Sequence, residues 1–233
     1  MRARSSGRAL STATDLRAFI GALFAAAALF AFSGPSDALE VSVKDDKGRP
    51  VKDAVVYAKT KGGVPPAPAG GENAVIDQVD KEFVPYVTVV RAGTAVSFPN
   101  RDRIRHHVYS FSRARTFEIP LYKGKPSKPI LFDKPGVVVL GCNIHDWMSA
   151  YVFVVETPFY AVTRDDGKAR IAGLPPGSYD VEAWHPRMRG APASVRKSVR
   201  VTTEGRGETA FVIQQAPAWR AWRAPTTSGG GYR

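Results

Sequence analysis

The pattern of apolar and polar residues along this chain is that of short β-strands separated by turns. Residues 39–43 alternate, residues 54–58 form a second apolar run, and Asp45-Asp-Lys-Gly48 lies between them. Such runs on either side of a turn predict a hairpin over residues 39–62. Heptad spacing is absent, and 18 prolines and 21 glycines supply many turn positions, so the sequence favours an all-β fold.

The strand pattern resumes over residues 73–156, after a Gly/Pro/Ala-rich segment at 61–71 that is typical of a linker. Strand-like runs alternate here with turns and with a polar loop at residues 99–105. The predicted strands lie at 83–90, 94–98 and 106–111, and two further runs within 137–155 enter and leave a short turn. This block therefore predicts a separate β-domain.

A third block of strands is predicted over residues 157–215. Residues 161–171 have the pattern of a hairpin around Asp166-Gly167, and later strands are predicted at 195–201 and 208–213. The last residues, 216–233, contain Trp, Arg and Gly but no periodicity, which is typical of a disordered basic tail.

The first 38 residues have the pattern of an export signal. Several arginines precede an uncharged apolar run at 18–32, and Ser36-Asp-Ala38 places small residues where a signal peptidase cleaves. A retained membrane anchor is the alternative, but the apolar run is short and Gly34-Pro35 interrupt it. We expect cleavage near Ala38, a periplasmic location and no integral membrane segment in the mature form.

The charge of the chain limits the class of partner. The formal net charge is +12, and the first 38 residues hold four basic and two acidic side chains, which leaves +10 for the mature chain. Such a charge favours a partner with an acidic face. Nucleic acid is not expected as a partner, because the protein is predicted to be exported and lacks interleaved basic and aromatic residues.

The chemistry of the chain is concentrated in Cys142-x2-His145-x2-Met148, within the short turn between two predicted strands. Cys142 is the only cysteine, so an intramolecular disulfide is excluded. Alone, Cys142 and Met148 would be ordinary core residues. With a second histidine from His106 or His107, however, thiolate, imidazole and thioether form a donor set that suits copper, whereas zinc sites usually lack methionine.

Enzymatic activity is not expected. The chain has four histidines and no His-x-His pair, too few donors for a type 1 copper site together with a further catalytic copper cluster. No Ser/His/Asp triad or glycine-rich phosphate loop is visible. His185 and Met188 supply only two donors and do not predict a second copper site.

The turn and the stretch Val96-Ser-Phe-Pro-Asn-Arg-Asp…His106-His-Val-Tyr together resemble cupredoxins, the small blue-copper electron-transfer proteins, with a ligand spacing similar to that of amicyanin. The combined pattern also resembles plastocyanin-like proteins labelled methylamine utilisation proteins. The resemblance implies a Greek-key β-sandwich that binds one type 1 copper ion. It further implies His106, Cys142 and His145 as equatorial ligands and Met148 as the axial ligand. His107 stands where the family usually has Asn, so an exchange of ligand between His106 and His107 stays open.

The flanking segments resemble a carboxypeptidase-regulatory-like domain, a second small β-sandwich. Residues 39–58 are similar to its opening hairpin, and residues 163–179 are similar to its later strands. The resemblance implies a discontinuous domain into which residues 73–156 are inserted. Alternatively, residues 39–58 form the first hairpin of the cupredoxin itself.

These observations predict a periplasmic electron carrier that exchanges electrons with a redox protein such as a cytochrome c or a dehydrogenase. The family resemblance implies His145 as the electron port, with Trp147 beside it as a docking surface. Arg101, Arg103 and Arg105 would surround that surface with positive charge. A copper carrier or metallochaperone without an electron-transfer role is the alternative function, and a cupredoxin fold used only as a scaffold is a third.

Overall fold

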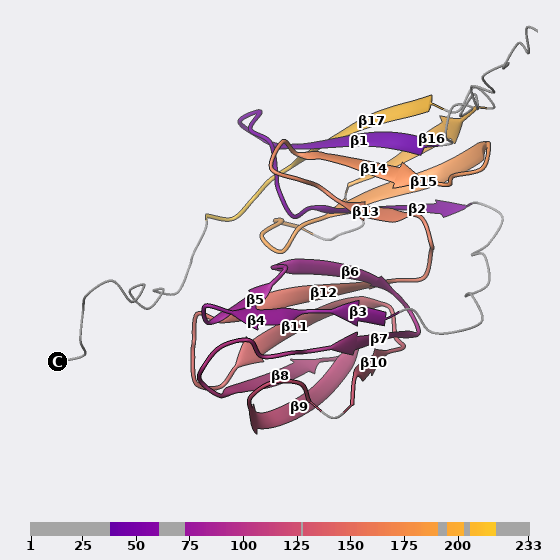
Figure 1. Ribbon diagram of the computed structural model, residues 1–233. Helices are drawn as coiled ribbons and strands as arrows, with labels where there is room; N and C mark the ends of the chain where they lie inside the picture. The colour runs from indigo at the N-terminus through magenta and orange to yellow at the C-terminus, as the bar shows by residue number, and fades with distance from the viewer. Residues whose placement is uncertain (1–37, 61–72, 127, 191–194, 203–205, 218–233) are drawn as a thin grey trace, which may run out of the picture. The chain divides into compact units, whose positions relative to one another are not determined.

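The computed structural model describes residues 38–60, 73–126, 128–190, 195–202 and 206–217 (Figure 1). All of the regular secondary structure within these ranges is β-strand, which confirms the predicted all-β fold class. No stretch of the described chain forms a helix able to span a membrane. The predicted export signal, the linker at 61–71 and nearly all of the predicted tail lie outside the described residues.

The first sandwich, called the flanking sandwich below, is built from strands at both ends of the chain. One sheet has the order β14-β1-β17 and the other has the order β13-β2-β15-β16. The strands are β1 (Ala38–Asp45), β2 (Val55–Thr60), β13 (Tyr160–Val162), β14 (Lys168–Ala172), β15 (Gly177–Trp184), β16 (Arg196–Val201) and β17 (Arg206–Ile213). β1 pairs with the distant β17 in parallel and with β14 in antiparallel orientation.

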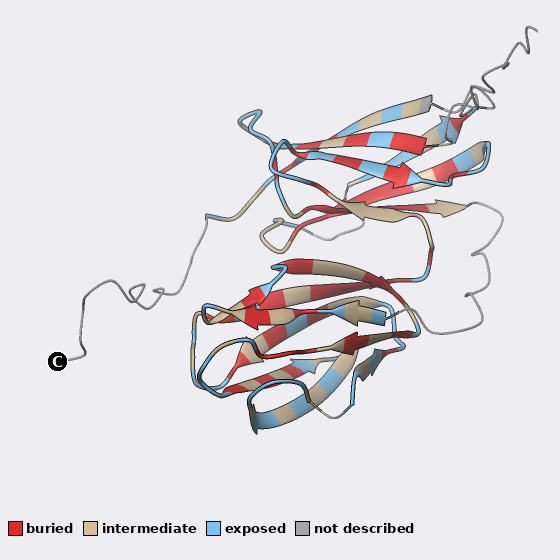
Figure 2. Ribbon diagram, viewed as in Figure 1, coloured by how far each residue is buried: buried red, intermediate tan, exposed pale blue. Residues whose placement is uncertain are grey.

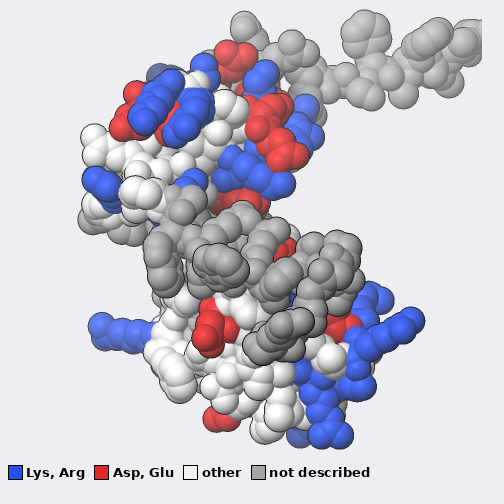
Figure 3. Space-filling model, turned by 90° about the vertical axis from the view of Figure 1, so that its left-hand side faces the viewer, with Lys and Arg blue, Asp and Glu red and all other residues white. Residues whose placement is uncertain are grey.

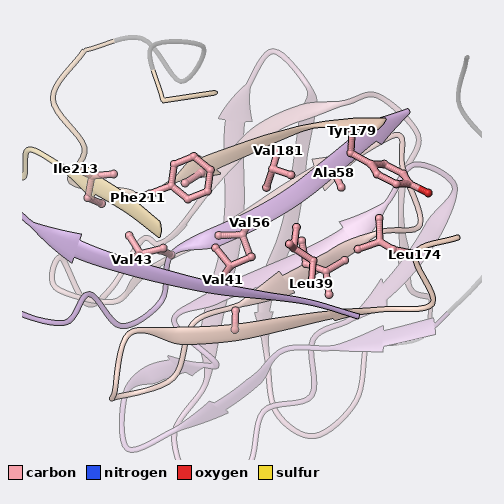
Figure 4. Packing of buried hydrophobic residues seen from close by; sticks show 14 of the residues in the cluster. Leu39, Val41, Val43, Val56, Ala58, Leu174, Tyr179, Val181, Phe211 and Ile213 are labelled. Atoms are coloured by element: carbon pink, nitrogen blue, oxygen red, sulfur yellow. The ribbon is translucent and has the colours of Figure 1, made fainter. Parts of the chain in front are cut away.

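The core of the flanking sandwich is aliphatic and aromatic. Leu39, Val41 and Val43 alternate along β1 and point into a cluster that includes Leu174 and Phe211 (Figure 4). The alternation of buried and exposed residues along β1 and β14 is visible in Figure 2. A period of two residues thus buries one face of each strand, as the sequence pattern requires.

The prediction of a hairpin over residues 39–62 is wrong, because β1 and β2 lie in different sheets and do not pair. The turn itself forms: the Gly48 N–H donates to the Asp45 carbonyl at 3.0 Å, and Lys44 bridges to Pro50. The chain then leaves β1 and crosses to the other sheet, so that Val51 and Ala54 are buried in the core. Alternation looks the same in two paired strands as in two strands that face each other across a core, and it could not separate these arrangements.

The prediction of a hairpin over residues 161–171 is wrong for the same reason: the turn forms, but the two strands beside it do not pair with each other. A turn closes where the Gly167 N–H donates to the Arg164 carbonyl at 2.9 Å, but β13 pairs with β2 and β14 pairs with β1. The turn after β1 and the turn between β13 and β14 therefore each connect one sheet of the flanking sandwich to the other.

The second sandwich, called the site sandwich below, covers residues 73–155. A five-stranded sheet has the order β6-β12-β11-β8-β9, a second sheet has the order β10-β7-β3, and β4 pairs with β5. The strands are β3 (Asn73–Val75), β4 (Asp77–Val79), β5 (Glu82–Val84), β6 (Val87–Arg91), β7 (Thr94–Ser97), β8 (His106–Ser112), β9 (Arg115–Tyr122), β10 (Ile130–Phe132), β11 (Gly136–Cys142) and β12 (Ser149–Val155). Its core contains Phe98, Phe132 and Leu140.

Strand pairing places the predicted site residues at one end of the five-stranded sheet. β11 pairs with both β12 and β8, and Cys142 is opposite Val108. Because the strands are antiparallel, the start of β8, the end of β11 and the start of β12 meet at the same end. His106 begins β8, and the turn with His145 and Met148 joins β11 to β12.

Candidate metal centre

The turn between β11 and β12 is closed by two backbone hydrogen bonds. The Cys142 N–H donates to the Met148 carbonyl at 3.2 Å, and the Met148 N–H donates to the His145 carbonyl at 2.9 Å. The antiparallel register continues directly beyond the turn, where Gly141 pairs with Ser149. Three side chains with donor atoms are therefore held on one short, internally bonded turn.

His106 brings a fourth donor side chain from β8. Its Nδ1 lies 3.8 Å from Sγ of Cys142, and Nδ1 of His145 lies 3.7 Å from the same sulfur. The donor atoms of these three residues all lie within 4.8 Å of one another, and no other group of His, Cys, Asp or Glu side chains in the described ranges is arranged to hold a metal ion. His106 is completely buried and Cys142 is 3% exposed.

Met148 is also buried beside this group. Its side chain is 1% exposed and belongs to the same core cluster as Cys142. Cys142 and Met148 also line one surface pocket together with Tyr109 and Asp146. The structure thus brings all four predicted ligands to one end of the site sandwich.

His107 faces away from this group. Its Nε2 lies 2.9 Å from Oε1 of Glu118, and its ring contacts the edge of Tyr109 with centroids 6.1 Å apart. The His106 ring lies against Cys142, whereas the His107 ring lies against Glu118, so the two side chains point in different directions. Of the two candidates that the sequence leaves open, His106 is the one that faces Cys142.

Asp102 is a member of the site that the sequence analysis did not identify. Its Oδ2 lies 2.7 Å from Nε2 of His106, the ring nitrogen on the side away from Cys142. Asp102 also accepts the backbone N–H groups of Asp80 at 2.7 Å and Lys81 at 2.9 Å, in the turn between β4 and β5. A carboxylate four residues before a histidine was the signal in the sequence, but such spacing is common in polar loops.

Asn100 ties together the loop that carries Asp102. Its side-chain amide donates to the carbonyls of Ile104 and Tyr122, both at 2.9 Å, and its Oδ1 accepts the Asp102 N–H at 2.9 Å. The loop before β8 is therefore fixed from within by the Asn100 side chain.

The electrostatics of the buried pair favour a thiolate next to a protonated imidazole. Burial alone would raise the pKa of Cys142, but the contact with His106 and the N–H groups of His107 and Ile144 lower it below its ordinary value. Burial alone would lower the pKa of His106, but its contacts with Cys142 and Asp102 raise it above 6.5. A deprotonated thiol is the form that binds metal ions.

His145 behaves differently from His106. Its side chain is only partly buried, and burial together with the nearby positive charges of His106 and Lys81 lowers its pKa. It therefore presents a neutral imidazole, the form that can coordinate a metal. Its ring centroid lies 5.0 Å from that of His106 and 5.1 Å from that of Trp147.

The basic residues predicted near the site are at the surface. Arg103 and Arg105 are exposed, while Arg101 is exposed and forms an ion pair with Asp77 at 2.9 Å. In Figure 3, Lys and Arg side chains gather at the right-hand edge of the lower half. His185 and Met188 belong to the flanking sandwich, where His185 contacts Arg187 and Gln215.

Solved structures that resemble this chain include cupredoxins and a copper-containing nitrite reductase. A copper-containing nitrite reductase from Thermus scotoductus SA-01 is 25% identical over 41% of this chain and 26% of its own length, with a TM-score of 0.35. A purple cupredoxin from Nitrosopumilus maritimus is 20% identical over 36% of this chain and 99% of its own, with a TM-score of 0.31. An oxidized amicyanin variant is 19% identical over 42% of this chain and 99% of its own, with a TM-score of 0.33.

The sequence matches no protein-family model and no curated protein sequence. The TM-scores of the similar structures are low, and the chain spans about a quarter of the nitrite reductase. The function proposed below therefore rests on the arrangement of the chain's own side chains.

Proposed function

We propose that this protein is a mononuclear type 1 copper protein that carries electrons between redox partners in the periplasm. The observation that supports this best is the position of one buried thiol sulfur within 3.8 Å of Nδ1 atoms from two histidines. A buried methionine lies on the same turn. Thiolate, two imidazoles and a weak thioether are the donor set of blue-copper sites.

The residues present fit a copper ion better than the alternatives. A structural zinc site would be expected to have four Cys or His ligands, but the third donor side chain of this turn, Met148, is a methionine. The Cys142 thiol loses its proton more readily than an ordinary cysteine, because the His106 contact and two backbone N–H groups lower its pKa. His106, Cys142, His145 and Met148 would hold the ion, and copper would supply a one-electron Cu(II)/Cu(I) couple.

The chain's own contribution is to hold these four side chains in one arrangement. The turn is closed by backbone hydrogen bonds, and His106 is clamped between Cys142 and Asp102. A site whose donors are fixed in advance changes little when its charge changes, which favours fast electron transfer. Burial of His106, Cys142 and Met148 also keeps water from these donors.

His145 is the proposed route for electrons, because it is the one of the four side chains that is not fully buried. Trp147 lies against its ring and supplies an apolar surface. We propose that this surface docks a redox protein with an acidic face, such as a cytochrome c or a dehydrogenase, and that Arg103 and Arg105 steer the encounter. Catalysis is not part of the proposal, since the histidines of the chain are too few for an additional catalytic copper cluster.

Repeated redox cycling distinguishes electron transfer from copper carriage. We expect the copper-loaded protein to lose its colour on reduction and to regain it on reoxidation over many cycles. Copper should stay with the protein in the presence of a Cu(I) chelator, because three of the four donors are buried. Rapid loss of copper to the chelator on the first reduction would contradict electron transfer and favour the carrier function.

A further inference from the structure

The far side of the His106 ring is held by a carboxylate. Nε2 of His106 lies 2.7 Å from Oδ2 of Asp102, while Nδ1 of the same ring lies 3.8 Å from Sγ of Cys142. A carboxylate accepts hydrogen bonds only, so the ring nitrogen that faces it must carry the proton. The contact therefore leaves Nδ1 as the ring atom directed to the sulfur.

Asp102 is itself fixed by the surrounding backbone. It accepts the N–H groups of Asp80 and Lys81, and its own N–H donates to Asn100. Both Asp80 and Lys81 have positive φ, 53° and 60°, which turns their N–H groups toward the same carboxylate. The Asp102 side chain is only 13% exposed. The β4–β5 turn thus holds a negative charge behind His106.

A second carboxylate–histidine pair in the same sandwich provides a comparison. His107 and Glu118 lie 2.9 Å apart, but the Glu118 side chain is 63% exposed and His107 faces away from Cys142. A solvated pair of this kind contributes little energy. The Asp102–His106 pair differs because it is shielded from solvent and connects directly to a proposed ligand.

We propose that Asp102 is a positioning residue that directs Nδ1 of His106 toward Cys142 and favours the Cu(II) over the Cu(I) form of the site. The first part concerns the chain alone, and the second part rests on the function proposed above. Carboxylates bonded to ligating histidines fix the tautomer and the ring orientation and raise the basicity of the ligand. An added negative charge stabilises the ion of higher charge more, so the effect must be larger for Cu(II) than for Cu(I).

The positioning role can be tested in the metal-free protein by 15N-correlated NMR of the histidine side chains. We expect the wild-type protein to show a proton on Nε2 of His106 that exchanges slowly with water. In Asp102→Ala this signal should shift and exchange at least tenfold faster, whereas Glu118→Gln should leave it unchanged. An unprotonated Nε2 in the wild-type protein would overturn the proposal without any variant being needed.

The effect on copper is tested by the ratio of the dissociation constants for Cu(I) and Cu(II). Asp102→Asn keeps a hydrogen-bond acceptor but removes the charge, so we expect Cu(II) binding to weaken about tenfold more than Cu(I) binding. For a one-electron couple, tenfold corresponds to a potential about 59 mV higher. Asp102→Glu, which keeps the charge, should restore most of the wild-type ratio, and Glu118→Gln should leave the ratio unchanged.

The outcomes separate this proposal from the proposed function. A purely structural role of Asp102 would weaken both copper states equally, and an unchanged ratio in Asp102→Asn would overturn the charge effect while a copper site persists. If the wild-type protein bound no copper through Cys142, the proposed function and the charge effect would fail together. The NMR result on His106 would still decide the positioning role.

Discussion

Each of the two sandwiches buries one histidine, and the two histidines are held in opposite ways. His106 in the site sandwich lies between a carboxylate and a thiol, and these contacts raise its pKa above 6.5. His185 in the flanking sandwich is 5% exposed, and its Nδ1 accepts the Arg187 N–H at 3.1 Å and lies 3.0 Å from the Gln215 amide nitrogen. Burial and the nearby charge of Arg187 lower the pKa of His185 to about 4.

The difference shows that partners, rather than burial, decide what a buried histidine can do. Both imidazoles are removed from water, which by itself disfavours the charged form. In the flanking sandwich the His185 ring meets the Arg187 N–H and the Gln215 side-chain amide, and its lowered pKa makes it a neutral structural residue. In the site sandwich an anionic partner on each side makes His106 suitable for a metal centre.

Exchange of either histidine for glutamine should separate the two roles most strongly. His106→Gln should weaken Cu(II) binding by about 1000-fold, or about 4 kcal/mol, because one of the strong donors is lost. His185→Gln, the matched control, should change Cu(II) affinity by less than about threefold, or about 0.7 kcal/mol. Competition titration against a chelator measures both, and equal losses in the two variants would contradict the assignment.

The pH dependence of stability should have opposite signs for the two histidines. Because the folded-state pKa of His185 is depressed to about 4, the unfolded chain binds a proton first as the pH falls below 6.5. The contribution of His185 to the free energy of unfolding should therefore be lost between about pH 6.5 and pH 4, by up to about 3 kcal/mol. The raised pKa of His106 acts in the other direction, with a contribution that is present below pH 6.5 and lost as the pH rises.

Urea unfolding of the metal-free protein from pH 4 to 8, followed by circular dichroism, isolates these contributions as differences between wild type and each glutamine variant. The difference for His185→Gln should decrease as the pH falls, and the difference for His106→Gln should decrease as the pH rises. The same sign for both variants would show that the two histidines do not differ as described.

The smallest effect is expected at His107. Its pair with the exposed Glu118 should contribute less than about 1 kcal/mol to the free energy of unfolding. His107→Gln should leave the spectrum of the copper-loaded protein unchanged, because the ring faces away from Cys142. A loss of colour in His107→Gln, but not in His106→Gln, would exchange the roles of the two histidines.

The part of the site that could be predicted from the sequence is the local part. Cys142, His145 and Met148 lie on one turn, so their spacing alone brings them together. The family resemblance implied His106 as a ligand but left an exchange with His107 open. The structure decides between them, because the His106 side chain, and not that of His107, lies beside Cys142. Asp102 was missed because its role depends on the N–H groups of Asp80 and Lys81 in the β4–β5 turn, 22 and 21 residues away in the sequence.

For the fold as well, the sequence pattern predicted local structure but not which distant strands pair. Period-two alternation predicted strands and an all-β protein, because alternation reports which faces are buried. It did not predict that β1 pairs with β17 at the other end of the chain, or that β1 and β2 separate into two sheets. Pairing between distant strands depends on which faces meet in the folded core, and no single segment encodes it.

The most direct test of a Cys142-centred copper site is the visible absorption spectrum after Cu(II) loading, with Cys142→Ala as the control. The arrangement of Cys142 between His106 and His145 predicts an intense blue band that is absent in the variant. A pale spectrum that is the same in both proteins would contradict a thiolate-bound type 1 copper ion and the electron-transfer function that depends on it.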